Sequence, residues 1–71
     1  ARLRKLQNEL KQTEEEISRL ESRNEEIDNL LTLEEVYTDV KRLMELNNEK
    51  KDIEHRLECL LEKWEDLASM L

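Results

Sequence analysis

Hydrophobic residues recur at alternating spacings of three and four along both parts of the chain, the spacing of the a and d positions of a coiled-coil heptad. The first series is Leu3, Leu6, Leu10, Thr13, Ile17, Leu20, Asn24, Ile27 and Leu31. The second series is Leu43, Leu46, Lys50, Ile53, Leu57, Leu60, Trp64, Leu67 and Leu71. The pattern predicts two long helices, each with one narrow apolar seam.

The two series do not share one heptad frame, and the break falls in the stretch TLEEVYTD, residues 32–39. Coiled coils absorb insertions of three or four residues, but the step from Leu31 to Val36 is five residues. A single helix, which the absence of Gly and Pro would permit, would be roughly 105 Å long. We therefore predict an all-α fold in which two long helices form an intramolecular antiparallel coiled-coil hairpin. The expected helices cover about 2–31 and 39–70, with a tip at about 32–38.

Folding the chain back at this tip pairs each a position of one helix with a d position of the other. The predicted layers are Leu3 with Leu67, Leu6 with Trp64, Leu10 with Leu60, Thr13 with Leu57, Ile17 with Ile53, Leu20 with Lys50, Asn24 with Leu46 and Ile27 with Leu43. The heptads also permit shifts by one heptad. One shift leaves Trp64, Leu67 and Leu71 without partners, and the other leaves Leu3 and Leu6 without partners.

The positions beside the seam test the pairing independently. On the g flank the hairpin predicts three complementary ion pairs, which are Glu9 with Lys63, Glu16 with Arg56, and Arg23 with Glu49. The e flank instead carries Val40 and Leu61, and Ala68 extends it. These residues are either ordinary surface side chains or a docking strip for another domain.

The tip has its own capping signals. Thr32 and Glu35 fit a capping box that would begin a short helical turn over Leu33 to Tyr37. Thr38 would then cap the second helix, with Asp39 in the first turn of that helix. We expect a small apolar plug at this end of the seam, made of Leu30, Leu33, Val36 and Tyr37.

Composition excludes several classes of function. Charged residues make up 44% of the chain and the net charge is −7, which disfavours unaided binding to nucleic acid or anionic lipid. No apolar run approaches the ~18 residues of a membrane span, and the polar start is unlike a signal peptide. The lone Cys59 fits a reducing compartment, so we expect a cytoplasmic protein. Because the chain is short and lacks an initiator Met, we expect one monomeric domain cut from a larger protein.

The sequence offers little for catalysis. His55 and Cys59 lie on one helix at outward positions, and two ligands are fewer than a structural zinc site needs. Without Gly there is no phosphate-binding loop, so we expect no enzyme activity, metal or cofactor in this segment. Lys50 in the seam would extend to Glu21 or Glu54, and together with Asn24 it would select the register.

Basic residues gather in two places despite the acidic total. Those at the open end of the hairpin are Arg2, Arg4, Lys5, Lys11 and Lys63. Those in the middle of the hairpin are Arg19, Arg23, Lys50 and Lys51. Either group is a candidate for contact with nucleic-acid phosphates, although the interleaved acids favour a solvated face of mixed charge.

Two short motifs go beyond a generic coiled coil. EVYTD at 35–39 contains Tyr37 and Asp39, and KWEDL at 63–67 contains Trp64, Glu65 and Leu67. Together with Glu9-Leu10, Glu16-Ile17 and Leu20-Glu21 in the first helix, they resemble the C-terminal domain of ABC-F ATPases of the Uup-like branch. The tip lacks the Asp-Pro often found before the Tyr in that family, and Lys63 stands where Arg is usual.

The resemblance implies a bacterial cytoplasmic parent protein with two ATP-binding cassettes, which would hold ATP and Mg²⁺ outside this segment. Such proteins act on the ribosome during translation, some in antibiotic resistance, and the Uup domain is linked to DNA binding. The expected partners are therefore the parent's ATPase domains and a ribosome or other nucleic acid, without a membrane. A structural or protein-binding hairpin from an unrelated protein, and a parallel dimer of long helices, are the alternatives.

Overall fold

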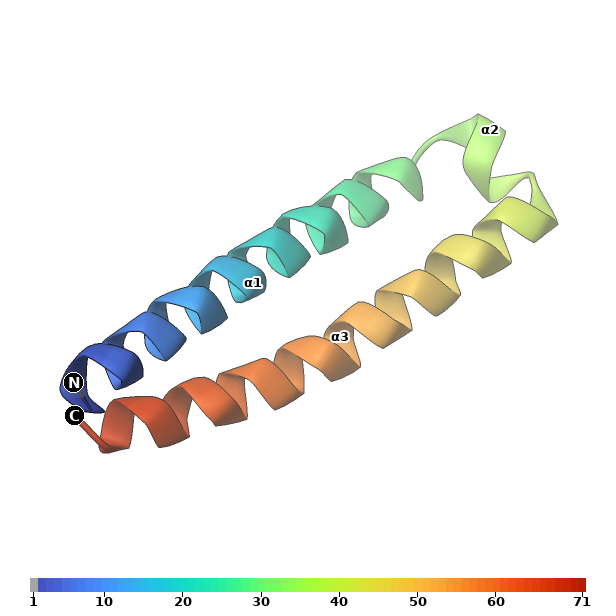
Figure 1. The fold of residues 1–71 in the computed structure, drawn as a ribbon. Helices are drawn as coiled ribbons and strands as arrows, with labels where there is room; N and C mark the ends of the chain where they lie inside the picture. The colour runs from blue at the N-terminus through green and yellow to red at the C-terminus, as the bar shows by residue number, and fades with distance from the viewer. Residues whose placement is uncertain (1) are drawn as a thin grey trace.

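The chain forms an antiparallel helical hairpin in the computed structural model, which describes residues 2–71. These residues form α1 (Arg2–Leu30), the short α2 (Glu34–Tyr37) and α3 (Val40–Ser69). The helices α1 and α3 run side by side, and α2 closes one end (Figure 1). The Cα trace measures 53 × 15 × 13 Å, about half the length of a single continuous helix. The predicted fold class is therefore confirmed, and the helix boundaries lie within about a residue of those expected.

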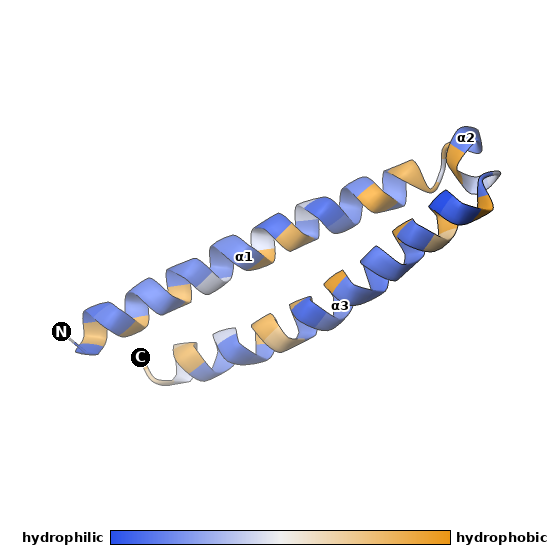
Figure 2. Ribbon diagram, turned by 45° about the vertical axis from the view of Figure 1, so that its right-hand side comes forward, coloured by the Kyte–Doolittle hydropathy of each residue, from blue (hydrophilic) through white to orange (hydrophobic). Residues whose placement is uncertain are grey.

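The core is the predicted seam between the two long helices, and hydrophobic residues of α1 and α3 lie mostly on the facing sides (Figure 2). The buried apolar side chains are Ile17, Ile27, Val36, Leu46, Ile53, Leu60 and Leu67. Thr13 is also buried in the seam, where its hydroxyl donates a hydrogen bond of 2.8 Å to the Glu9 carbonyl oxygen. That bond within α1 lets a polar residue occupy a core position.

The ion pairs beside the seam agree with the predicted register between α1 and α3. That register predicted Arg23 with Glu49 and Glu16 with Arg56, and both pairs form. A shift by one heptad would bring Arg23 level with Arg56 instead. On the other flank the side chains of Trp64 and Lys50 reach further along α1, where the Trp64 indole nitrogen donates a hydrogen bond of 2.9 Å to Glu14 and Lys50 forms an ion pair with Asp28.

Lys50 shows how the seam accommodates a charged residue. Its ammonium lies between two carboxylates, those of Asp28 and Glu54. Pairing with these carboxylates at the edge of the seam reduces the cost of placing a cation beside apolar side chains.

The tip uses different capping residues from those predicted. The Thr32 hydroxyl donates to the Asn29 carbonyl at the end of α1, and α2 has no side-chain cap. Asp39 is the cap of α3, where its carboxylate accepts a 3.3 Å hydrogen bond from the Arg42 backbone nitrogen. Thr38 instead donates to the Glu34 carbonyl. The T-x-x-E capping box and the Thr38 cap are thus both wrong, because each hydroxyl satisfies a carbonyl of the preceding helix.

The predicted apolar plug exists in part. Val36 is completely buried and belongs to one cluster with Ile27, Leu46 and Ile53, against which Leu30 packs. Leu33 and Tyr37, by contrast, are 42% and 51% exposed. Val36 therefore anchors α2 to the hairpin, and the other two side chains lie on the surface of the tip.

Candidate functional site

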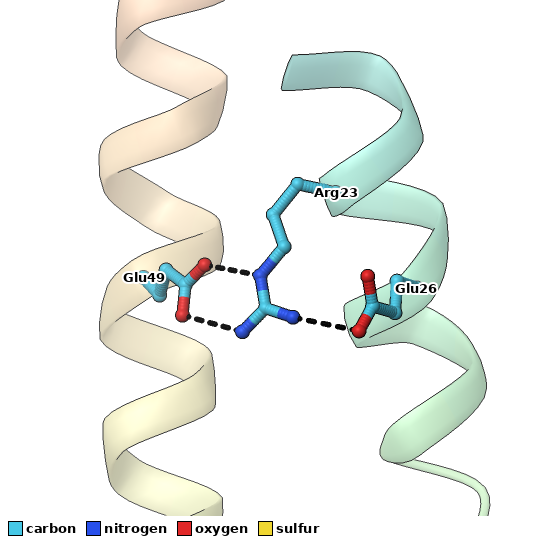
Figure 3. A network of polar contacts seen from close by, with 3 residues as sticks. All are labelled: Arg23, Glu26 and Glu49. Carbon is cyan, nitrogen blue, oxygen red and sulfur yellow. Dashed lines mark hydrogen bonds and ion pairs between the residues drawn. The ribbon is translucent and has the colours of Figure 1, made fainter. Parts of the chain in front are cut away.

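One edge of the seam is closed by ion pairs on the g flank. Arg23 on α1 makes two hydrogen bonds to Glu49 on α3, at 2.5 Å and 2.9 Å, and a third of 3.0 Å to Glu26 (Figure 3). The hydrogen bonds from Arg23 lower the pKa of the Glu49 carboxyl, although partial burial opposes the shift. The same bonds raise the pKa of the Arg23 guanidinium. This pair is one of the three predicted, and it is confirmed.

A second predicted g-flank pair joins Arg56 to Glu16, with hydrogen bonds of 3.0 and 3.3 Å. The third predicted pair, Glu9 with Lys63, is absent from the ion pairs within residues 2–71. Two interhelical ion pairs, spaced one heptad apart on each helix, therefore define this edge.

The e flank is the other edge of the seam, and there Lys50 bridges the helices. Its ammonium contacts Asp28 on α1 and lies 3.8 Å from Glu54 on α3. Contact with Glu54 was predicted, and Asp28 replaces Glu21 as the partner on α1. Further along this flank, towards the open end, no ion pair links the helices in the part of the chain that the structure describes.

A shallow groove of about 380 Å³ lies on this part of the e flank. It is lined by Glu14, Ile17, Ser18, Glu21, Leu61 and Trp64. Leu61 is 49% exposed, and the Trp64 ring is held in place by its hydrogen bond to Glu14. The groove thus combines an apolar surface with two carboxylates and contains no basic side chain.

Sequence reasoning found only part of this groove. Leu61 was a candidate for the docking strip, and Trp64 was noted for its motif, but Glu14 and Glu21 were missed. The available signal was a pair of carboxylates one heptad apart on the flank that faces Leu61. The other strip candidates lie elsewhere: Val40 is 69% exposed at the start of α3, and Ala68 is half-buried near its end. Asn47 and Glu54 occupy the e positions between Val40 and Leu61, so the three residues do not form one continuous strip.

The basic residues predicted for the open end lie on the first part of α1 and on α3 beside it. Arg2, Arg4, Lys5, Lys11 and Lys63 are all exposed. None of them takes part in an ion pair within residues 2–71. Their charges are therefore available to solvent and to anions.

The basic residues predicted for the middle of the hairpin are not brought together. Arg23 is bound to Glu49 and Glu26 on the g flank, whereas Lys50 is bound to carboxylates on the e flank. Arg19 and Lys51 are exposed. The structure therefore divides this group, and two of its four charges are already matched by acids.

Residues 2–71 contain no group of three or more His, Cys, Asp or Glu side chains arranged to hold a metal ion. His55 and Cys59 are both exposed on α3. No helix among these residues is both long and apolar enough to span a membrane.

The chain matches a known protein family. The model of the ABC transporter C-terminal domain family matches residues 2–69, nearly the whole chain. The chain belongs to this family. Neither a search of curated proteins nor a search of solved structures gave a match.

The motif residues of this ABC transporter C-terminal domain have distinct structural positions. Asp39 caps α3, Trp64 binds Glu14 across the seam, and Leu67 is buried in the core. Tyr37 and Glu65 are exposed, so their side chains lie largely on the surface of the hairpin. Three of the five motif residues therefore maintain the hairpin itself.

Proposed function

We propose that this domain is a non-catalytic accessory module of an ABC-F ATPase of the Uup-like branch. In this proposal the ATPase domains of the parent bind ATP and Mg²⁺, and the monomeric hairpin helps to position the parent on a ribosome or other nucleic acid in the cytoplasm. Membership of the ABC transporter C-terminal domain family supports an accessory role. The EVYTD and KWEDL motifs support the narrower assignment.

The observation that carries the nucleic-acid part is the set of exposed cations at the open end. Arg2, Arg4, Lys5, Lys11 and Lys63 have no carboxylate partner within residues 2–71, whereas Arg23, Lys50 and Arg56 do. Cations without acidic partners are the ones that can neutralise phosphates. We therefore propose phosphate contact at the open end, where all five predicted cations lack an ion pair within residues 2–71, rather than in the middle of the hairpin, where only Arg19 and Lys51 do.

The test is to measure binding of the domain to ribosomes, RNA and duplex DNA over a salt series. We expect binding that weakens as salt rises, and a Lys5→Glu/Lys11→Glu variant with an affinity lower by about tenfold. A Lys41→Glu/Arg42→Glu variant makes the same change of charge at the opposite end of the hairpin and is the matched control. Binding that does not change with salt concentration, or an equal loss of affinity in both variants, would show that the open end does not contact phosphates.

A second candidate function is a protein-binding hairpin, and the groove beside Trp64 favours it. This function does not compete for the same surface, because the groove is acidic and lies on the e flank. The two functions are therefore separable by mutation.

A further inference from the structure

The two edges of the seam are built differently, and the difference identifies a surface without a partner. The g flank is closed by Arg23 with Glu49 and by Arg56 with Glu16. Between Glu14 and Glu21 on the e flank, the corresponding space is open and lined by apolar side chains. Open apolar surface between two helices is a typical packing site for a third helix.

The chemistry of the groove restricts what can occupy it. Ile17, Leu61 and Trp64 would contact an apolar side chain, and burying such a side chain against them favours association. Glu14 and Glu21 stand one heptad apart on α1, and neither forms an ion pair within residues 2–71. A ligand that fits must therefore bring apolar side chains together with positive charge.

We propose that this groove binds a basic amphipathic helix of a partner protein. Leucine-like side chains of that helix pack on Leu61 and Trp64, and lysines or arginines one heptad apart pair with Glu14 and Glu21. The spacing of the two carboxylates matches the repeat of one face of a helix. The hairpin has its own buried core, so the proposed helix would add a contact at the edge of a seam that is already packed.

The charge of the groove argues against the other occupants. Nucleic acid would bring phosphates towards Glu14 and Glu21, and the like charges repel. A second copy of the chain, with a net charge of −7, would likewise bring mostly acidic surface. A basic helix is the occupant whose charge and apolar face both fit.

The inference can be tested directly because the chain contains one Trp, and Trp64 lines the groove. The hairpin is titrated with a designed peptide of about 18 residues, long enough to form a helix, with leucines on one face and lysines and arginines one heptad apart beside them. A second peptide keeps the leucines and carries glutamates in place of the basic residues. We expect a saturable change in Trp64 fluorescence with the basic peptide alone.

Paired variants locate the binding site. Leu61→Asp is expected to weaken binding by about tenfold or more, because an apolar contact is lost. Met44→Asp adds the same charge at an exposed apolar residue outside the groove and should leave binding unchanged. Glu21→Lys is expected to weaken binding by about threefold to tenfold, since exposed ion pairs are modest, whereas Glu25→Lys should not.

Three results would overturn the inference. They are the absence of saturable binding by the basic peptide, equal binding of the glutamate peptide, and equal losses for Leu61→Asp and Met44→Asp. The Lys5→Glu/Lys11→Glu variant should still bind the peptide normally, so failure of nucleic-acid binding and failure of this inference are distinguishable. Displacement of the peptide by RNA, or self-association that Leu61→Asp abolishes, would assign the groove to a different occupant.

Discussion

The Arg23–Glu49 pair shows how one interhelical contact makes stability depend on pH. Arg23 donates two hydrogen bonds to the Glu49 carboxylate, which lowers the pKa of Glu49 in the folded chain. A carboxyl whose pKa is lowered by folding stabilises the fold above its unfolded pKa, which is about 4.3. That stabilisation is lost as the pH falls through the lower, folded pKa.

We therefore predict that Glu49→Gln lowers the melting temperature by a few degrees at pH 7 and by much less at pH 3. Thermal unfolding followed by circular dichroism at both pH values measures the difference. Glu45→Gln is the control, because Glu45 is exposed and forms no ion pair within residues 2–71. An equally large fall in melting temperature at pH 3 and at pH 7 would show that the charge of Glu49 is not the source of the stabilisation.

Asn24 is a second residue whose individual environment has a measurable effect. It occupies a seam position, and its side-chain oxygen is buried without a hydrogen-bond partner among the described residues. A buried polar atom in that state costs about 1–3 kcal/mol. Polar seam residues nevertheless help to select one register among several.

We predict that Asn24→Leu raises the free energy of unfolding by about 1–2 kcal/mol, measured by urea denaturation. The same substitution should relax the choice of register, which cysteine crosslinking at the ends of the helices would detect as mixed products. A destabilised Asn24→Leu variant would mean that the amide makes a favourable contact after all.

At the scale of the elements, the tip depends on one residue of α2. Val36 is fully buried against the end of the seam, while Val40, four residues later, is 69% exposed. The two valines therefore allow one substitution to be compared in two environments.

We predict that Val36→Ala lowers the free energy of unfolding by about 2 kcal/mol, since the methyl groups removed are completely buried. Val40→Ala should change it by less than about 0.5 kcal/mol, as is usual for exposed positions. Chemical denaturation of the two variants measures both values. Similar losses in the two variants would mean that α2 is not held by Val36.

The existence of the helices, the place of the reversal and two of the g-flank ion pairs were all predictable from the sequence. The capping residues were not predictable, because Thr32, Thr38 and Asp39 can each cap a helix. The sequence does not show which backbone group each of these side chains will bind. Asp39 prevails at α3, where a carboxylate suits the positive end of the helix dipole.

For the molecule as a whole, the register was predictable from the charges on the g flank, because Arg23 with Glu49 and Glu16 with Arg56 both form. Each a and d position looks the same after a shift of one heptad, so the choice depends on these flanking charges. The groove was not predictable, because it depends on the direction in which the Trp64 side chain extends to reach Glu14. The heptad pattern places Trp64 in the seam but does not give that direction.

The register makes a prediction for the whole hairpin. Cysteines at Leu3 and Leu67, in a Cys59→Ser background, should crosslink rapidly within one chain, whereas cysteines at Leu10 and Leu67 should crosslink slowly. Gel mobility after mild oxidation distinguishes these products, and sedimentation should give a monomer at every concentration. Faster crosslinking of Leu10 with Leu67 would show that the helices are shifted by one heptad, and crosslinks only between chains would show that the chain forms a dimer instead of a hairpin.

The start of α1 and the end of α3 lie side by side, at the opposite end from α2 (Figure 1). Any polypeptide attached there would hold α2 at a distance set by the 53 Å length of the hairpin. Two helices packed along their length bend less than one, so the hairpin would act as a stiff spacer. A change of register by one heptad would alter that reach by about 5 Å, half the rise of seven residues, because the step is shared between the two helices.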